Sequence, residues 1–193
     1  SWIGPWSATM FVGQMEENRD VPEPYAWGMR AEFAPTILDG LEIGLFRVMQ
    51  LGGEGRPSGF KTWADAFLGQ DNYGGNSKHQ DKSKEPGNQL AGIDLRWRPM
   101  TQFPFALYGQ VAGEDEDHFL PNALMFQYGI ETWGNWESST WRMFLEYADT
   151  TSTWWTDEIR QNASYNHGIY SDGYRHHGRS VGHWADSDSE IVS

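Results

Sequence analysis

Apolar and polar residues alternate along most of this chain, in segments of about ten residues. The clearest segment has its apolar residues at every second position, at Tyr25, Trp27, Met29, Ala31 and Phe33. Arg30 and Glu32 fall between them. Because successive side chains of a strand point to opposite faces, this pattern predicts strands with one apolar and one polar face.

The alternation predicts seven strands and the start of an eighth. Their expected positions are Trp6–Gln14, Tyr25–Phe33, from Leu41 onward, Ala91–Arg98, Phe103–Val111, Leu124–Glu131, Trp141–Tyr147 and from Ser189 onward. Phe46, Arg47 and Val48 blur the pattern of the third strand. A short helix is expected between the third and fourth strands, with Thr62 capping Trp63–Leu68. The predicted fold class is all-β and antiparallel.

The links between these strands alternate in length. The short links are Ala34–Gly40, Pro99–Gln102 and Gly134–Ser139. The long links are Met15–Pro24, Leu51–Gly87, Gly113–Asn122 and Asp149–Asp188. Short turns on one rim and long loops on the other are typical of outer-membrane β-barrels, whose long loops lie outside the cell.

Strand length and aromatic positions also favour a membrane barrel. Leu124 to Thr132 covers about eight steps, or roughly 26 Å at ~3.3 Å each. A tilt of ~40° reduces this to about 20 Å, near the ~25 Å apolar band of such barrels. Aromatic residues gather near strand ends, as interfacial girdles do. They are Trp6, Tyr25, Trp27, Phe33, Trp97, Phe103, Trp133, Trp136, Trp141 and Tyr147. A soluble carbohydrate-binding β-sandwich remains the alternative, because it produces the same alternation.

Composition excludes several classes of protein. The 193 residues include 27 acidic and 14 basic ones, and no basic stripe is visible, which argues against nucleic-acid binding. The absence of Cys excludes disulfides and thiolate metal sites. No run of 18 apolar residues predicts a membrane-spanning helix, but spanning strands need none. Because the chain opens at Ser1-Trp2 without a signal peptide, we expect it to be an internal piece of a longer protein.

Several short motifs follow one another from Trp6 to Asp188. They are Trp6 with Phe11–Gln14, Arg19–Pro22, Trp27–Arg30, Gly52–Pro57, Tyr165–Tyr170, Gly173–Arg175, Gly178–Arg179, Gly182–His183, and Asp186 with Asp188. In this order and spacing they resemble the capsule-assembly Wzi family, and the stretch after Tyr165 is the most specific part of the resemblance.

The resemblance implies that residues 1–193 are part of a single outer-membrane β-barrel domain, without the N-terminal signal and helical region and without the C-terminal strands. It also implies a non-catalytic, lectin-like role in retaining capsular polysaccharide on the cell surface. The expected partners are capsular polysaccharide and outer-membrane lipid, and we expect a monomeric barrel. Two alternatives of other classes are a passive channel for small solutes and a glycoside hydrolase, although no pair of catalytic carboxylates is identifiable.

The predicted contact site for polysaccharide lies in the long segment Asp149–Asp188. Its candidate residues are Trp154, Trp155, Tyr165, Tyr170, Tyr174, Arg175 and Arg179. Sugar rings stack on aromatic planes, and Arg suits anionic sugars. The alternative is that these aromatic side chains pack the loop itself over the barrel mouth. No catalytic residue and no cofactor are predicted. No metal site is predicted either, because the His residues lack the spacing of metal ligands.

Overall fold

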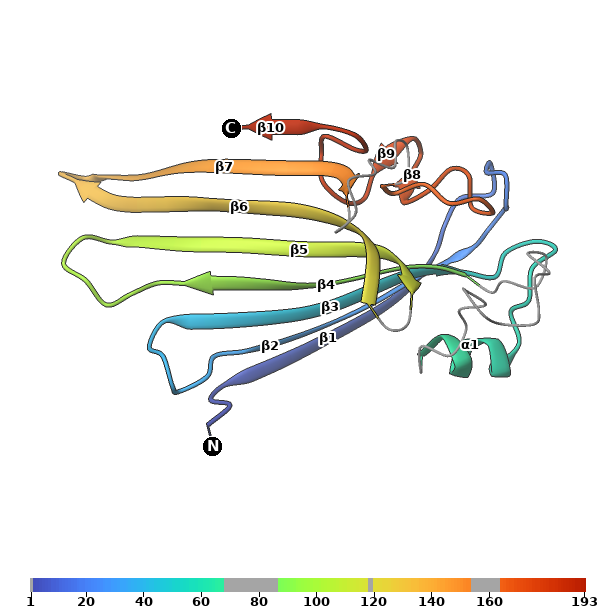
Figure 1. Cartoon of the computed structure of the whole chain (residues 1–193), viewed down its shortest axis with the longest axis horizontal. Helices are drawn as coiled ribbons and strands as arrows, with labels where there is room; N and C mark the ends of the chain where they lie inside the picture. The colour runs from blue at the N-terminus through green and yellow to red at the C-terminus, as the bar shows by residue number, and fades with distance from the viewer. Residues whose placement is uncertain (1, 68–86, 118–119, 154–163) are drawn as a thin grey trace.

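Eight antiparallel strands form one sheet with the order β1-β2-β3-β4-β5-β6-β7-β10 (Figure 1). The computed structural model describes residues 2–67, 87–117, 120–153 and 164–193. The strands are β1 Trp6–Gln14, β2 Tyr25–Phe33, β3 Leu41–Leu51, β4 Gly87–Trp97, β5 Phe105–Asp117, β6 Leu120–Trp136, β7 Ser139–Thr153 and β10 Glu190–Val192. Among the described residues β1 and β10 are the two edges, so the sheet is not closed.

Two smaller elements lie at the end of the sheet that carries the long links (Figure 1). They are the helix α1, Phe60–Phe67, and a two-stranded hairpin formed by β8, Arg175–His176, and β9, Arg179–Ser180. We call this end the long-loop end and the opposite one the short-turn end. No helix in the described part of the chain is long and apolar enough to cross a membrane.

The predicted strands are confirmed, but several of their bounds differ. β5 begins at Phe105 and not at Phe103, and β6 and β7 extend into the predicted links Gly134–Ser139 and Asp149–Asp188. β5 and β6 continue to the pair Asp117 and Leu120, so the predicted long link Gly113–Asn122 is mostly paired strand. The helix begins at Phe60, where the Trp63 N–H donates to the Gly59 carbonyl, so Thr62 lies inside the helix and is not its cap. Antiparallel pairing explains why the strands run on into the predicted links, because backbone hydrogen bonds extend a hairpin regardless of side-chain polarity.

The outer face of the sheet carries the alternating apolar residues, and these are exposed. Ile93 is 42% exposed, Leu95 45% and Leu145 59%. Other exposed members of this face are Met10, Val12, Met29, Leu45, Leu107, Phe126, Tyr128, Ile130, Trp141 and Met143. No second sheet covers this face within residues 2–67, 87–117, 120–153 and 164–193, so the alternative of a two-layer sandwich is wrong for them.

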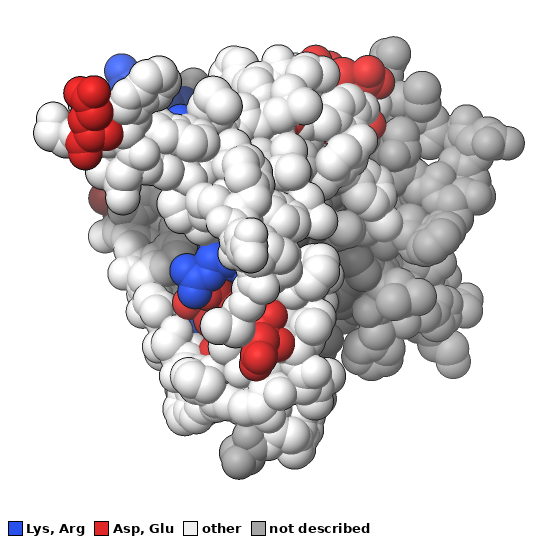
Figure 2. Space-filling view, turned by 90° about the vertical axis from the view of Figure 1, so that its left-hand side faces the viewer, with Lys and Arg blue, Asp and Glu red and all other residues white. Residues whose placement is uncertain are grey.

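The inner face carries charged pairs that join one strand to the next or to the strand beyond it. Arg30 of β2 binds both carboxylate oxygens of Asp94 of β4, at 2.5 and 2.8 Å. Arg96 of β4 and Arg142 of β7 both donate to Glu131 of β6, whose side chain is only 4% exposed. Seen from the short-turn end, side chains of opposite charge lie next to one another and are surrounded by uncharged ones (Figure 2).

Candidate functional site

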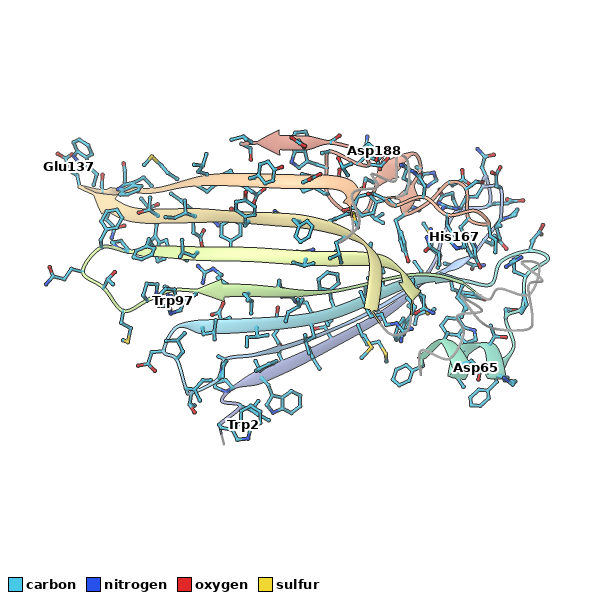
Figure 3. All side chains as sticks on the ribbon, viewed as in Figure 1. Trp2, Asp65, Trp97, Glu137, His167 and Asp188 are labelled. Atoms are coloured by element: carbon cyan, nitrogen blue, oxygen red, sulfur yellow. The ribbon has the colours of Figure 1, made fainter. Side chains whose placement is uncertain are left out.

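The segment 164–188, which we call the cap, folds over the inner face at the long-loop end. Tyr165 and Tyr174 of the cap pack against Leu90, Ala112 and Met125 from three adjacent strands. His167 and Asp188, labelled in Figure 3, lie in the cap beside the ends of the strands. The cap therefore supplies the second layer of a small apolar core, which the single sheet cannot form alone.

Tyrosine hydroxyls join the cap to the backbone of the sheet end. The Tyr174 hydroxyl donates to the Asn88 carbonyl at 2.7 Å, and the Tyr170 hydroxyl donates to the Gly52 carbonyl at 3.0 Å. Tyr165, Tyr170 and Tyr174 are only 8%, 1% and 6% exposed. Their rings pack inside the protein, as expected if they hold the cap in place, and a direct contact of these tyrosines with glycan stays a prediction.

A tight turn in the cap depends on Gly173. Its φ is +64°, and a side-chain carbon there would lie 1.9 Å from the Tyr165 carbonyl oxygen. The close approach allows the Tyr174 N–H to donate to that same carbonyl at 2.8 Å. Any other residue would meet both the steric clash and the cost of a left-handed backbone.

Arg19, in the link between β1 and β2, also holds the cap in place. Its guanidinium donates to the carbonyls of Gly173, at 2.8 Å, and Arg175, and to the Glu16 carboxylate at 2.9 Å. The Arg19 side chain is only 2% exposed. Arg19 was not among the predicted site residues, although it begins the motif Arg19–Pro22, which is the signal that could have identified it.

Glu16 is the anion at this junction. One carboxylate oxygen contacts the His176 ring at 2.6 Å, and the other accepts the His177 backbone N–H at 3.0 Å. Burial raises the pKa of Glu16, but hydrogen bonds from its own backbone N–H, the His177 N–H, His176 and Arg19 outweigh this and lower the pKa to about 2. The carboxylate is therefore ionised at any ordinary pH.

The predicted arginines differ in their surroundings. Arg175 binds both oxygens of Asp186 at 2.7 Å and donates to the Asn166 side chain at 2.6 Å, so it braces the cap. Arg179 is exposed on β9. The predicted contacts Trp154 and Trp155 lie outside the described residues.

A polar hollow opens where the β1–β2 link meets the cap. Its volume is about 280 Å³, just below the range of pockets for drug-sized ligands, which suits a single sugar ring. It is lined by Glu16, Asn18, Arg19, Asp172, Arg175, His177 and Gly178. Of the predicted residues that the structure describes, only Arg175 lines this hollow.

A larger cavity of about 870 Å³ lies between the cap and the inner face. Trp184 lines it and is nevertheless 72% exposed, so its ring stands at the mouth beside His183, with ring centres 5.7 Å apart. Trp184 was not among the predicted site residues. Its position directly after the motif Gly182–His183 is the available signal.

Comparison with known proteins gives a match over almost the whole chain. The family model for the capsule assembly protein Wzi matches residues 1–192. The chain belongs to the Wzi family. A Klebsiella pneumoniae relative, described as an uncharacterized 55.8 kDa protein in the cps region, is 40% identical over 151 residues, which is 77% of this chain and 28% of the relative.

A solved structure of the same family has the same fold. Escherichia coli Wzi, described as an outer-membrane protein involved in group 1 capsule assembly and a carbohydrate-binding β-barrel, superposes with a TM-score of 0.78 at 35% identity. The match covers 99% of this chain and 38% of that one. This Wzi-family chain thus spans well under half the length of the relatives it matches.

The motifs that carry the resemblance to Wzi meet in space. Arg19 of one motif donates to Gly173 of another, which is 154 residues away. Tyr170 likewise reaches Gly52 across 118 residues. Several Wzi motifs of this chain therefore serve to hold the cap against the strand ends.

Proposed function

We propose that this chain is part of an outer-membrane β-barrel that binds capsular polysaccharide at the cell surface and performs no catalysis. The single observation that carries the proposal is the agreement between the Wzi family match and the one-layer sheet with an exposed apolar outer face. The carbohydrate-binding barrel of E. coli supports the choice of ligand. Because the chain spans only part of its relatives, the proposal concerns the full-length protein.

Membrane placement follows from the exposed outer face. A single sheet leaves Ile93, Leu95 and Leu145 in contact with solvent, which is unfavourable in water by about 25 cal/mol per Å² of apolar surface. Lipid tails remove that cost, while the charged pairs of the inner face stay in water. In this orientation the long-loop end, with the cap, faces the outside of the cell.

The proposed glycan-binding surface is the outward side of the cap and its neighbouring links. The polar hollow offers Asn18, Asp172 and His177 as hydrogen-bonding groups, and its rim lies beside Arg175 of the predicted site. Trp154, Trp155 and Arg179 remain proposed contacts on the same segment. Sugar hydroxyls need a few such convergent polar groups, and a neighbouring aromatic plane adds stacking.

Capsule retention by a deletion strain tests the proposal. The strain is complemented with the full-length protein carrying Trp154→Ala and Trp155→Ala, and cell-bound and released polysaccharide are measured. We expect a shift of polysaccharide from the cells to the medium. Trp136→Ala is the matched control, because Trp136 is 74% exposed at the short-turn end. Retention equal to that of the wild type, at equal surface amounts of protein, would remove these two residues from the site.

A passive channel is the second candidate, and the charged inner face is the observation that favours it. Planar-bilayer recordings of the full-length protein separate the two functions. Steady conductance without glycan binding would support the channel, and glycan binding without conductance would support polysaccharide attachment.

A further inference from the structure

The helix α1 does not belong to the cap, because it packs on the opposite, outer face of the sheet. Trp63 lies edge-on to Tyr25 of β2, with ring centres 5.5 Å apart, and Phe67 lies edge-on to Trp27 at 5.8 Å. Ala66 is fully buried in the cluster of Trp27, Met49 and Leu51. Figure 3 shows α1, with Asp65 labelled, beside the strands at the long-loop end.

The sequence of α1 makes it amphipathic. Phe60, Trp63, Ala64 and Phe67 recur at helical spacing and therefore share one side. Lys61 and Asp65 form an ion pair on another side, one turn apart. Burial against the sheet accounts for only part of the apolar side, since Phe60 is 90% exposed and Phe67 53%.

An apolar groove runs between this helix and the sheet. Its volume is about 380 Å³, and the described residues that line it are uncharged: Trp27, Met49, Phe60, Trp63, Ala64 and Phe67. A methylene takes about the space of a water molecule, ~30 Å³, so the groove has room for on the order of ten of them. Its floor, Trp27 and Met49, belongs to the same outer face as the exposed apolar residues of the sheet.

We propose that this groove holds an acyl chain of an outer-leaflet membrane lipid. The inference rests on the proposed function, because it takes the outer face to be in contact with lipid. The groove continues that surface toward the long-loop end, at the level where Tyr25 and Trp27 stand in the expected aromatic girdle.

The contacts of Arg47 support placing the groove at the height of the membrane interface. Arg47 lies on the outer face, paired across β3 and β2 with Met29, where a bare cation in lipid would be unfavourable. Its guanidinium reaches toward α1, donating to the Phe67 carbonyl at 3.4 Å and to Gln89. Long cationic side chains extend in this way toward an interface, and α1 here provides the polar end point.

Spin labels test where α1 lies, and the absence of native Cys makes single-site labelling direct. The full-length protein is labelled at Phe60→Cys, Lys61→Cys or Ile93→Cys and placed in phosphatidylcholine vesicles. We expect labels at 60 and 93 to collide with oxygen, which concentrates in lipid, and the label at 61 to collide with a water-soluble nickel complex. A label at 60 accessible only to nickel, with 93 accessible to oxygen, would overturn the groove proposal alone. A label at 93 accessible to nickel would overturn the membrane placement itself.

Lipid counting by native mass spectrometry tests occupancy. The detergent-solubilised full-length protein is mixed with phosphatidylglycerol, and bound lipids are counted for the wild type, Ala64→Trp and Ile37→Trp. Ala64→Trp fills the groove and is expected to lose one bound lipid. Ile37→Trp adds an indole ring at the short-turn end, where Ile37 is 79% exposed, and is expected to lose none. Equal lipid counts for all three proteins would overturn the proposal.

Discussion

The attachment of the cap through Arg19 leads to a sharp prediction for Arg19→Lys. The arginine spans the carbonyls of Gly173 and Arg175 and the carboxylate of Glu16 with one planar group. A lysine ammonium keeps the positive charge but cannot reach all three acceptors at once. It is expected to keep its ion pair with Glu16 and to leave the buried carbonyls without this donor.

The size of the effect follows from these hydrogen bonds. Each hydrogen bond to a charged group contributes about 1.5–3 kcal/mol, and part of the loss is recovered by water that enters. Arg19→Lys should therefore lower the free energy of opening the cap by about 2–4 kcal/mol. Since each 1.4 kcal/mol is a factor of ten, this corresponds to roughly 30- to 700-fold.

Hydrogen exchange of cap amides in the full-length protein measures this opening directly. The reporting amides are Tyr174, bonded to the Tyr165 carbonyl at 2.8 Å, and Val181, bonded to the Tyr174 carbonyl at 2.9 Å. Arg179→Lys is the matched control, because Arg179 is exposed on the same segment. Exchange within twofold of the wild type in Arg19→Lys would refute the role assigned to Arg19.

Three further predictions concern pH, lipid contact and the inner face. The pKa of Glu16 is about 2 in the folded protein against 4.5 for the free group, so its contribution to cap stability is complete above about pH 5 and is lost as pH falls through 4.5 toward 2. Pepsin should therefore cleave the wild-type cap increasingly over that range. Cleavage of Glu16→Gln that depends on pH as strongly as cleavage of the wild type would contradict the assignment. Ile93→Lys should destabilise the protein in bilayers by about 2–4 kcal/mol, measured by urea unfolding, whereas Gln110→Lys on the inner face should cost little, and equal costs would count against lipid contact. Glu131→Gln should cost about 2 kcal/mol in the same assay, because two guanidinium groups lose their shared carboxylate, and a cost below 0.5 kcal/mol would show that solvent already screens them.

The sheet could be predicted from the sequence because side-chain direction in a strand is fixed by the local backbone. The alternation placed β1 and β2 at the bounds that the structure has, and it assigned Ile93 and Leu95 to the exposed outer face. It was least clear around Phe46 and Val48, and the structure gives the reason. Both residues lie on the inner face and pack against the core formed by the cap, while Arg47 between them lies on the outer face, so the alternation is locally reversed.

The cap could not be predicted in the same way, because its arrangement depends on partners that lie far away in the sequence. Tyr170 is predicted as a polysaccharide contact from its type and its place in the long segment, and the structure shows that its hydroxyl bonds to Gly52 and that the residue is 1% exposed. A tyrosine can be buried at little cost wherever a backbone carbonyl accepts its hydroxyl, and composition does not reveal that carbonyl. Only the motifs carried the information, since Arg19, Gly52 and Gly173 stand in three of them. Their clustering at one junction indicates that, in this chain, these motif residues hold the cap in its place over the strand ends.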